Sequence, residues 1–275
     1  RSVKHAVFWG LPHRELEGIE SIGVDEVQYL TLVYQIDAGS KRLLWIGQDR
    51  TAKTFLRFFR MLGKERSGRL KFICSDMWKP YLKVIGKKAA QAIHVLDRFH
   101  IRQKLGKAID EVRAGEARQM KADGYEEVLK HSRWCLLKRP ENMTDKQTVK
   151  LSELLTYNLR SVRAYLLKED FQRFWEYVSP GWAAKFLDQW CTRTMRSKLE
   201  PMKKVARTLR NHRELILNWF RAKGAISAGI VEGLNNKVKL TTRRSYGFRT
   251  YDAVETALYH NLGALPEPGF THRFW

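Results

Sequence analysis

Residues 21–47 read SIGVDEVQYLTLVYQIDAGSKRLLWIG, and this stretch decides the fold. A short apolar run that contains two acids (21–27) is followed by a run rich in β-branched and aromatic residues (29–36). The turn DAGS then leads into a third apolar run (41–47). The close spacing and the short turns predict three antiparallel strands.

The next fifty residues alternate between helix and strand. Phe55, Phe58, Phe59 and Leu62 recur at helical spacing, which predicts an amphipathic helix with Thr51 as its N-cap. Two more strands are expected at 70–75 and 92–96, with a short helix at 80–88 between them. The order β-β-β-α-β-α-β predicts a mixed five-stranded sheet in which strands one and four lie side by side, the ribonuclease-H-like arrangement.

From about residue 101 to residue 222 the pattern is helical without strands, and we interpret this block as an all-helical insertion. Thr144 and Gln147 form an expected capping box, and residues 179–181 (SPG) an expected break. The tryptophans of the block are expected in its core: Trp134, Trp175, Trp182, Trp190 and Trp219. The predicted division is an N-terminal segment (1–20), an α/β catalytic domain (21–100 and 223–263), the insertion (101–222) and a tail (264–275).

The charge balance points to a polyanionic partner. The chain has 51 Lys and Arg against 29 Asp and Glu, a formal net charge of +22 in 275 residues. We therefore expect nucleic acid as partner, and neither a membrane nor a small-molecule substrate, since no long apolar run is present. Three widely separated cysteines argue against disulfides and zinc and favour a reducing, cytoplasmic location.

Three acids fit a metal site for phosphodiester chemistry. Asp25 and Asp76 close the first and fourth predicted strands, and Glu232 lies on a late helix that carries Asn236, Lys239 and Arg243 on one face. Each acid taken alone has an ordinary structural interpretation, as a strand-end cap, a helix N-cap or a helix-start acid. The predicted topology favours the metal site, because it places Asp25 and Asp76 at the same sheet edge.

Asp97 and His100 stand three residues apart after the fifth strand. Because that strand is one position farther from Asp25, Asp76 is the preferred metal ligand, and Asp97, His100 and Asn236 are expected beside the metals or the DNA. A helix N-cap with a neighbouring histidine is the alternative interpretation for Asp97 and His100. Glu26 points to the opposite face of its strand and is the weaker candidate.

The motifs GVDEV, SDMWKPY, VLDRFHI and GIVEGLNNKVKLTTRRSYGFR together resemble the DDE transposases of the ISL-three insertion-sequence family. The resemblance covers nearly the whole chain in order. It implies a ribonuclease-H-like catalytic domain with a helical insertion, and it places the family's acids on Asp25, Asp76 and Glu232. The family's DRFH segment falls on residues 97–100.

The resemblance implies Mg²⁺-dependent cleavage and transfer of DNA strands at the ends of a mobile element. It implies two Mg²⁺ ions, with Mn²⁺ as a substitute, held by the three acids. A dimer or larger assembly on DNA, in a bacterial cytoplasm at the nucleoid, is also implied. The expected DNA contacts are Arg98, Lys237, Lys239, Arg243, Arg244 and Arg249.

The sequence departs from the family in two places. The hairpin after Asp25 is about half a dozen residues shorter than usual, so catalytic competence depends on the register in which Asp25 is held. Family members usually begin with a zinc ribbon and a helix-turn-helix, whose patterns residues 1–20 do not show, and we expect this segment to be the remnant of a longer N-terminal region. Two alternatives stay open: a truncated or decayed transposase that binds DNA without cutting it, and a ribonuclease-H-like nuclease without strand transfer.

Overall fold

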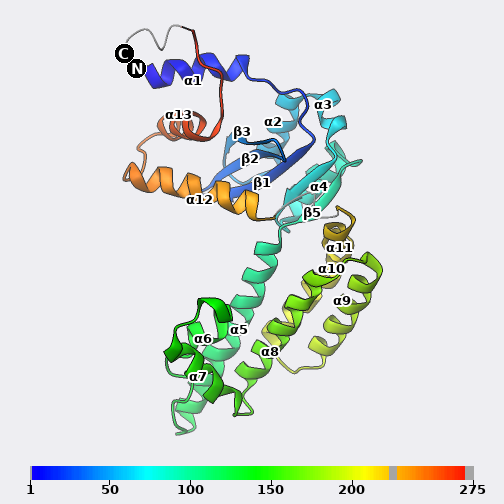
Figure 1. Cartoon of the computed structure of the whole chain (residues 1–275), viewed down its shortest axis with the longest axis vertical. Helices are drawn as coiled ribbons and strands as arrows, with labels where there is room; N and C mark the ends of the chain where they lie inside the picture. The colour runs from blue at the N-terminus through cyan, green and yellow to red at the C-terminus, as the bar shows by residue number, and fades with distance from the viewer. Residues whose placement is uncertain (1, 223–227, 270–275) are drawn as a thin grey trace. The chain divides into compact units, whose positions relative to one another are not determined.

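The chain divides into two compact units in the computed structural model, which describes residues 2–222 and 228–269 (Figure 1). The first, the α/β unit, contains the residues up to Phe99 and those from Arg221 onward. The second, the helical unit, runs from His100 to Phe220. Of the predicted domain segments, residues 223–227 and 270–275 lie outside the described residues.

A five-stranded mixed sheet forms the centre of the α/β unit (Figure 1). Its strands are β1 (Ser21–Val27), β2 (Leu30–Asp37), β3 (Ser40–Gln48), β4 (Phe72–Ser75) and β5 (Ile93–Leu96). The strand order is β3-β2-β1-β4-β5, with β1, β2 and β3 antiparallel and β4 and β5 parallel to β1. This confirms the predicted ribonuclease-H-like mixed sheet with strands one and four adjacent.

The hairpin between β1 and β2 is short but in unbroken register. Pairs run without a bulge from Ile22 opposite Gln35 to Val27 opposite Leu30. The turn consists of Gln28 and Tyr29, whose φ angles of 52° and 68° are both positive, as a type I′ turn requires. The short connection therefore matches the twist of the strands and leaves each side chain of β1 on a defined face of the sheet.

Helices α2 (Ala52–Leu62) and α4 (Lys79–Lys88) cover one face of the sheet. Their apolar sides share a core with β1 and β4, to which Val24, Phe55 and Ile73 contribute. The predicted N-cap of α2 is confirmed, because the Thr51 side chain accepts a hydrogen bond from the Thr54 amide at 3.0 Å. The short helix α3 (Lys64–Arg69) was not predicted.

Helix α12 (Ala228–Arg244) lies across the other face, on β1 and β2 (Figure 1). Val231, Leu234 and Val238 are buried, as its apolar spacing predicts. The approach to β1 is close: a Cβ at Gly23 would lie 2.4 Å from Val231 Cγ2, so only glycine fits at that position. The sequence indicates a start of this helix near residues 227–228, of which residue 227 lies outside the described residues.

Two further helices complete the α/β unit. Helix α13 (Tyr251–Leu262) packs on α12 and β3, and α1 (Ser2–His13) packs on α13. Helix α1 lies in the N-terminal segment, for which the sequence predicted no element.

The helical unit has no strand in residues 100–220, all of which the structure describes. Its elements are α5 (Arg98–Ala122, which begins in the α/β unit), α6 (Arg133–Leu137), η1 (Pro140–Asn142), α7 (Asp145–Leu155), α8 (Arg160–Gln172), η2 (Arg173–Glu176), α9 (Pro180–Met195), α10 (Glu200–Asn211) and α11 (Arg213–Arg221). The predicted capping box of Thr144 and Gln147 is present at the start of α7. The expected break at 179–181 is a helix start, since Pro180 is the first residue of α9.

Aromatic side chains form much of the interior of the helical unit. Trp190 is fully buried against Phe171, with ring centroids 4.8 Å apart. The prediction that all five tryptophans lie in the core was wrong for Trp134 and Trp182, whose side chains are 52% and 62% exposed. Each of these two rings lies under a neighbouring cation instead, because a large amphipathic ring can lie at the surface under a charge.

A buried carboxylate joins two helices of this unit. Glu116 of α5 accepts hydrogen bonds from the backbone amides of Arg160 and Ser161, each at 2.7 Å, and from the Ser161 hydroxyl. These amides belong to the first turn of α8, where the N-cap position is Leu159, a residue without a capping group. Glu116 therefore supplies from another helix the cap that the local sequence lacks.

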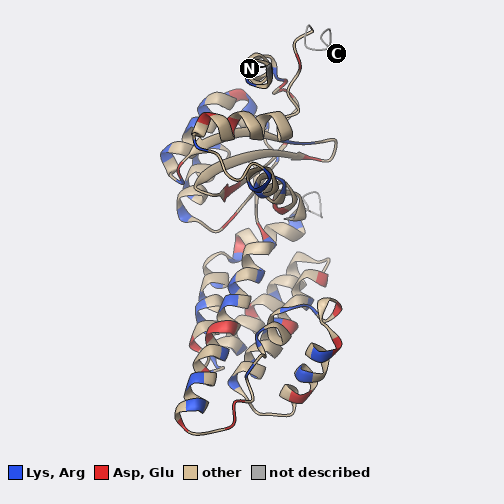
Figure 2. Ribbon diagram, turned by 90° about the vertical axis from the view of Figure 1, so that its left-hand side faces the viewer, with Lys and Arg blue, Asp and Glu red and all other residues tan. Residues whose placement is uncertain are grey.

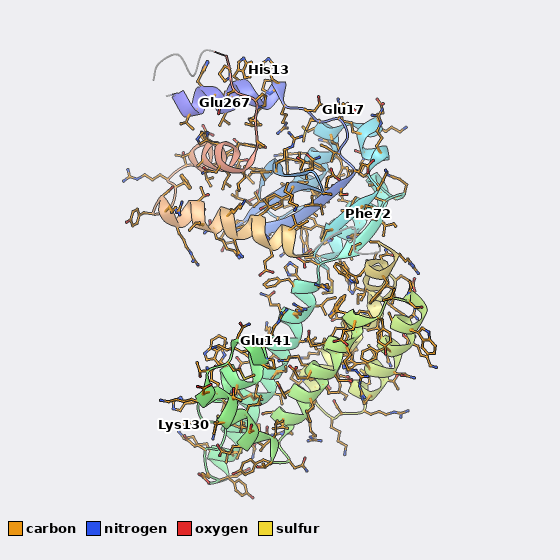
Figure 3. All side chains as sticks on the ribbon, viewed as in Figure 1. His13, Glu17, Phe72, Lys130, Glu141 and Glu267 are labelled. Carbon is orange, nitrogen blue, oxygen red and sulfur yellow. The ribbon has the colours of Figure 1, made fainter. Side chains whose placement is uncertain are left out.

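Ion pairs are frequent on the surface of the helical unit. Both basic and acidic residues occur along its helices (Figure 2). Lys130, which Figure 3 labels, lies in the segment after α5 and pairs with Glu127 at 3.9 Å.

The three cysteines, which are all buried, form no disulfide. In residues 2–222 and 228–269, no helix combines the length and the apolar character that crossing a membrane requires.

Candidate active site

Asp25 lies on the face of the sheet that α12 covers. Its Oδ2 accepts a hydrogen bond of 2.6 Å from Nδ2 of Asn235, and Oδ1 of Asn235 accepts one of 2.8 Å from the hydroxyl of Tyr34. Burial, and secondly the charge of Asp25, raises the pKa of Tyr34 well above its usual value, so the phenol stays protonated and donates. This chain of hydrogen bonds connects β1, α12 and β2 and fixes the direction of the Asp25 carboxylate.

Asp25, Asp97 and His100 form a group of possible metal ligands. One ligand atom of each lies within 4.8 Å of the others. Asp97 follows β5 and is buried, and its Oδ1 accepts a hydrogen bond of 2.8 Å from the Phe99 amide at the start of α5. His100 is the third residue of α5, three residues after Asp97. The N-cap that Asp97 makes therefore also fixes the backbone position from which the imidazole extends.

Asp76 is held by the protein itself. Its Oδ1 accepts a hydrogen bond of 3.0 Å from the Trp78 amide, and its Oδ2 forms an ion pair with Arg50. Arg50 also pairs with Glu26 at 2.8 Å and lies over the Trp78 ring, 4.7 Å from its centroid. Asp76 is therefore connected to Glu26, which points away from Asp25, and it is not in the group of Asp25, Asp97 and His100.

A buried histidine lies behind the end of β4. His94 Nε2 is 2.7 Å from the Ser75 hydroxyl, which donates its proton to the carbonyl oxygen of Asp76 at 2.9 Å. Since that hydroxyl has one proton, we infer that Nε2 of His94 carries the hydrogen in this contact. Burial lowers the pKa of His94 to about 4, which keeps the ring neutral.

The helix α12 places its two predicted site residues differently. Glu232 is half-buried and lies three residues, nearly one turn, before Asn235, but it is outside the group around Asp25. Asn236 is exposed to solvent. Because successive helical residues are about 100° apart, Asn235 faces the sheet where its neighbour Asn236 does not.

The predicted DNA contacts of α12 and its following turn share one environment. All five are exposed, and among the described residues none forms an ion pair: Lys237, Lys239, Arg243, Arg244 and Arg249. No Asp or Glu occurs between residues 233 and 251. Arg98, the remaining predicted contact, is half-buried at the first position of α5.

Comparison with known proteins identifies the family. A family model described as a transposase, of the DDE type named for ISL-three, matches residues 18–258. The chain belongs to the ISL-three family of DDE transposases. This match includes the whole sheet, the helical unit, α12 and the described site residues.

Two curated transposases show the extent of the similarity. The chain is 33% identical over 239 residues to the transposase for insertion sequence element IS1001 of Bordetella parapertussis. It is 28% identical over 264 residues to the transposase for insertion sequence element IS1557, found in two strains of Mycobacterium tuberculosis. These matches cover 84% and 86% of the chain but only 58% of each relative, so this transposase-family chain spans less than two thirds of their length.

The donor atoms in the site suit a divalent cation, which enzymes of this family generally use. Asp25 and Asp97 offer carboxylate oxygens, the ligands that Mg²⁺ and Mn²⁺ prefer, and His100 offers an imidazole nitrogen. Asn235 holds one oxygen of Asp25 and the Phe99 amide holds one oxygen of Asp97, while ligand atoms of both acids and of His100 lie within 4.8 Å of one another.

Three site residues were missed by the sequence analysis. Asn235 carried a signal, since it lies three residues after Glu232, but the i+4 neighbour was chosen instead. Tyr34 was assigned only to a strand, and its hydroxyl had no visible partner in the sequence. Arg50 stands in a loop where no periodic pattern points to its contacts.

Proposed function

We propose that this chain is the catalytic part of an insertion-sequence transposase, which cuts DNA strands at the ends of its element and joins them to target DNA. Family membership and the printed names of the two relatives support this assignment. The observation that carries it is the group formed by Asp25 of β1, Asp97 after β5 and His100 of α5. The neighbouring helix α12 carries exposed cations that pair with no acid among the described residues.

The proposed metal ligands are Asp25, Asp76 and Glu232, with two Mg²⁺ ions or Mn²⁺ in their place, and with Asp97, His100 and Asn236 beside the metals or the DNA. Asp25 and Asp76 both follow the last pair between β1 and β4, Val24 with Ser75. Asp97 has the stronger geometric support as a neighbour of Asp25. For Asp76 to bind a cation, Arg50 has to release its Oδ2.

Divalent ions bound by these oxygens would polarise the scissile phosphodiester and favour deprotonation of the attacking hydroxyl. In cleavage, a water oxygen forms a bond to phosphorus while the bond to the 3′-oxygen breaks, which leaves a 3′-hydroxyl and a 5′-phosphate. In joining, the oxygen of that 3′-hydroxyl forms a bond to a phosphorus of the target DNA while the target's own bond from phosphorus to the 3′-oxygen breaks, which leaves a free 3′-hydroxyl on the target strand. Asn235 keeps Asp25 turned toward this point, and the cap on α5 does the same for Asp97.

The cations of α12 are proposed to hold the DNA backbone. Exposed Lys and Arg without acid partners are available to neutralise phosphates, which fixes the duplex without selecting a sequence. Two element ends have to be held together for transposition, so we propose that the chain acts as a dimer or larger assembly on DNA at the nucleoid.

The proposal is tested with linear DNA that carries the ends of the element, taken from the DNA that flanks the coding sequence. Wild type is expected to cleave and join strands with Mg²⁺ or Mn²⁺ but not with EDTA. Glu232→Gln is expected to lose both reactions. Asp252→Asn is the matched control, because Asp252 is an exposed acid of α13 that pairs with Lys4 at 3.6 Å.

Each other outcome identifies a different function. Cleavage that survives Glu232→Gln would remove Glu232 from the site. Cleavage without joining would indicate a ribonuclease-H-like nuclease, and DNA binding without cleavage by wild type would indicate a transposase that has lost catalysis. Sedimentation of the protein with and without DNA measures the assembly state.

A further inference from the structure

Helix α12 ends in a Schellman motif. The Gly247 amide donates to the Thr242 carbonyl at 2.9 Å, and the Tyr246 amide donates to the Arg243 carbonyl at 3.1 Å. These are the two bonds that define the motif, and they put residue 246 at the position that adopts a left-handed conformation. Tyr246 has the expected φ of 52°.

A tyrosine at this position is unfavourable for the isolated fold. Glycine is the usual residue there, since a Cβ disfavours the left-handed region. A glycine stands one position later, where Gly247 has a φ of 91°. The turn therefore keeps a bulky aromatic side chain at the one position of the motif where glycine would be more stable.

No contact within the described residues compensates for this. The side chain of Tyr246 is 101% exposed. Within residues 2–222 and 228–269, its ring packs on no other aromatic ring, and its hydroxyl makes no hydrogen bond. The conformational strain and the full exposure together point to a binding partner outside the chain.

The surroundings of Tyr246 indicate what that partner is. Arg243 and Arg244 precede it and Arg249 follows it, all of them exposed and none in an ion pair with a described residue. Arginines in the last turn also favour the helix dipole, which accounts for Arg243 and Arg244 but not for the ring between them and Arg249. Exposed aromatic rings among cations are the usual platform on which unpaired nucleic-acid bases stack.

We propose that Tyr246 stacks on an unpaired base of the DNA whose backbone the neighbouring arginines hold. This inference rests on the proposed DNA-binding function. Tyr246 lies 14 residues after Glu232, which corresponds to about 21 Å along the axis of a helix. With the rise of about 3.4 Å per nucleotide of a duplex strand, this distance corresponds to roughly six nucleotides between the proposed catalytic acids and the point at which the stacked base leaves the duplex.

The test compares three substitutions of one residue in the full chain. Tyr246→Gly removes the ring, Tyr246→Phe keeps it, and Tyr246→Leu keeps apolar bulk without a π face. Affinity is measured by fluorescence anisotropy in EDTA, with a labelled oligonucleotide as a single strand and as a duplex. The absence of metal separates binding from catalysis.

Two opposite effects are expected from Tyr246→Gly. The midpoint of thermal unfolding rises by about 2–4 °C, because the left-handed strain is relieved. The Kd for the single strand rises by about 5- to 150-fold, the range expected for loss of one stacked base, with little change for the duplex. Tyr246→Phe keeps single-strand affinity within about twofold and Tyr246→Leu does not, because stacking requires the ring but not the hydroxyl.

Two controls separate stacking from other effects. Tyr29→Gly is the matched variant, since Tyr29 is also exposed (81%) with a φ of 68°, and it should gain stability without losing single-strand affinity. Arg244→Gln should weaken single strand and duplex alike and reduce the dependence of log Kd on log salt by about 0.7–0.9. Tyr246→Gly should leave this slope unchanged.

Four results would overturn the inference. These are unchanged single-strand affinity in Tyr246→Gly, an equal loss for single strand and duplex, an equal loss in Tyr29→Gly, or dissociation of an assembly by Tyr246→Gly with DNA affinity intact. The last would make the ring a protein contact. If wild type binds neither form of DNA, the proposed function itself fails, which is a different outcome.

Discussion

In the helical unit, Arg213 donates two hydrogen bonds of 2.9 Å to the two oxygens of Asp188, whereas Lys239 on α12 is exposed and pairs with no described acid. The hydrogen bonds that Arg213 donates to Asp188, together with the negative charge of Asp188, raise the pKa of Arg213 above its usual value. The same contrast holds for Lys203, which pairs with Glu200 at 3.2 Å. These cations of the helical unit are used in ion pairs within the fold, whereas Lys239 of α12 is available to bind an external anion.

The acids of the two regions differ in the same way. Glu116 is buried and accepts three hydrogen bonds from one helix end, which is a structural role. Asp25 is only partly buried, and one of its oxygens lies within reach of Asp97 and His100. Substitutions in the helical unit should therefore change stability without changing DNA chemistry, and those in the α/β site should do the reverse.

The largest effect is expected from Asp25→Asn. Loss of the carboxylate charge should reduce DNA strand cleavage roughly 10²- to 10⁴-fold, since a metal-held transition state is worth several kcal/mol. The asparagine keeps an oxygen that accepts from Asn235, so the unfolding temperature should stay within a few degrees. A cleavage rate within tenfold of wild type would contradict the role of Asp25.

Next in size is the loss of stability expected from Glu116→Ala. Leaving the Arg160 and Ser161 amides without a buried acceptor should lower the free energy of unfolding by about 2–4 kcal/mol. Glu116→Gln keeps one acceptor oxygen and should lose less. Denaturant titration measures both, and unchanged duplex affinity in the folded variants would show that the role is confined to the fold.

Stability should also depend on pH through His94. Its folded pKa of about 4 lies below the ordinary 6.5, so its contribution is complete above pH 6.5 and is lost as the pH falls toward 4. At up to 1.36 kcal/mol per pH unit, the loss between pH 6.5 and 5 is about 2 kcal/mol. His94→Gln should flatten this part of the profile in denaturant titrations, and an unchanged slope would contradict the shift.

The smallest effect is the most direct comparison of the two regions. Lys239→Gln should weaken duplex binding, since one phosphate contact is lost. The slope of log Kd against the logarithm of the salt concentration should decrease in magnitude by about 0.9. Lys203→Gln, which removes the same charge from a paired lysine, should change neither. Equal effects of both substitutions would mean that net charge alone governs binding.

The sequence predicted the sheet because hydrophobic alternation and short turns are local signals. These signals located the strands at 21–27 and 92–96, and the order of the elements then predicted that the first and fourth strands are adjacent. The α3 segment KERSGR was missed because it has no apolar stripe to detect. The tight turn at residues 28–29 was also not predictable from the sequence, because it requires positive φ angles that Gln and Tyr rarely adopt.

The site was less predictable than the fold. Reasoning from strand spacing located backbone positions, and it favoured Asp76 over Asp97 as the neighbour of Asp25. The side-chain contacts depend on Arg50, which holds Asp76, and on the α5 amide, which holds Asp97. Likewise, the choice between Asn235 and Asn236 depends on one residue of helical rotation, which periodicity cannot resolve without the position of the sheet.

The contact between Gly23 and Val231 shows that the site can be disturbed by a change that touches no polar atom. A single methyl group at position 23 would overlap Val231 Cγ2, so α12 would have to move outward. Asn235 and Glu232 would move with it, away from a β1 strand whose own register stays fixed. Trimming Val231 to alanine would make room for that methyl group again. At this point, the separation between the helix and its sheet depends on the absence of a side chain at residue 23 and on the size of the side chain at residue 231, and not on charge.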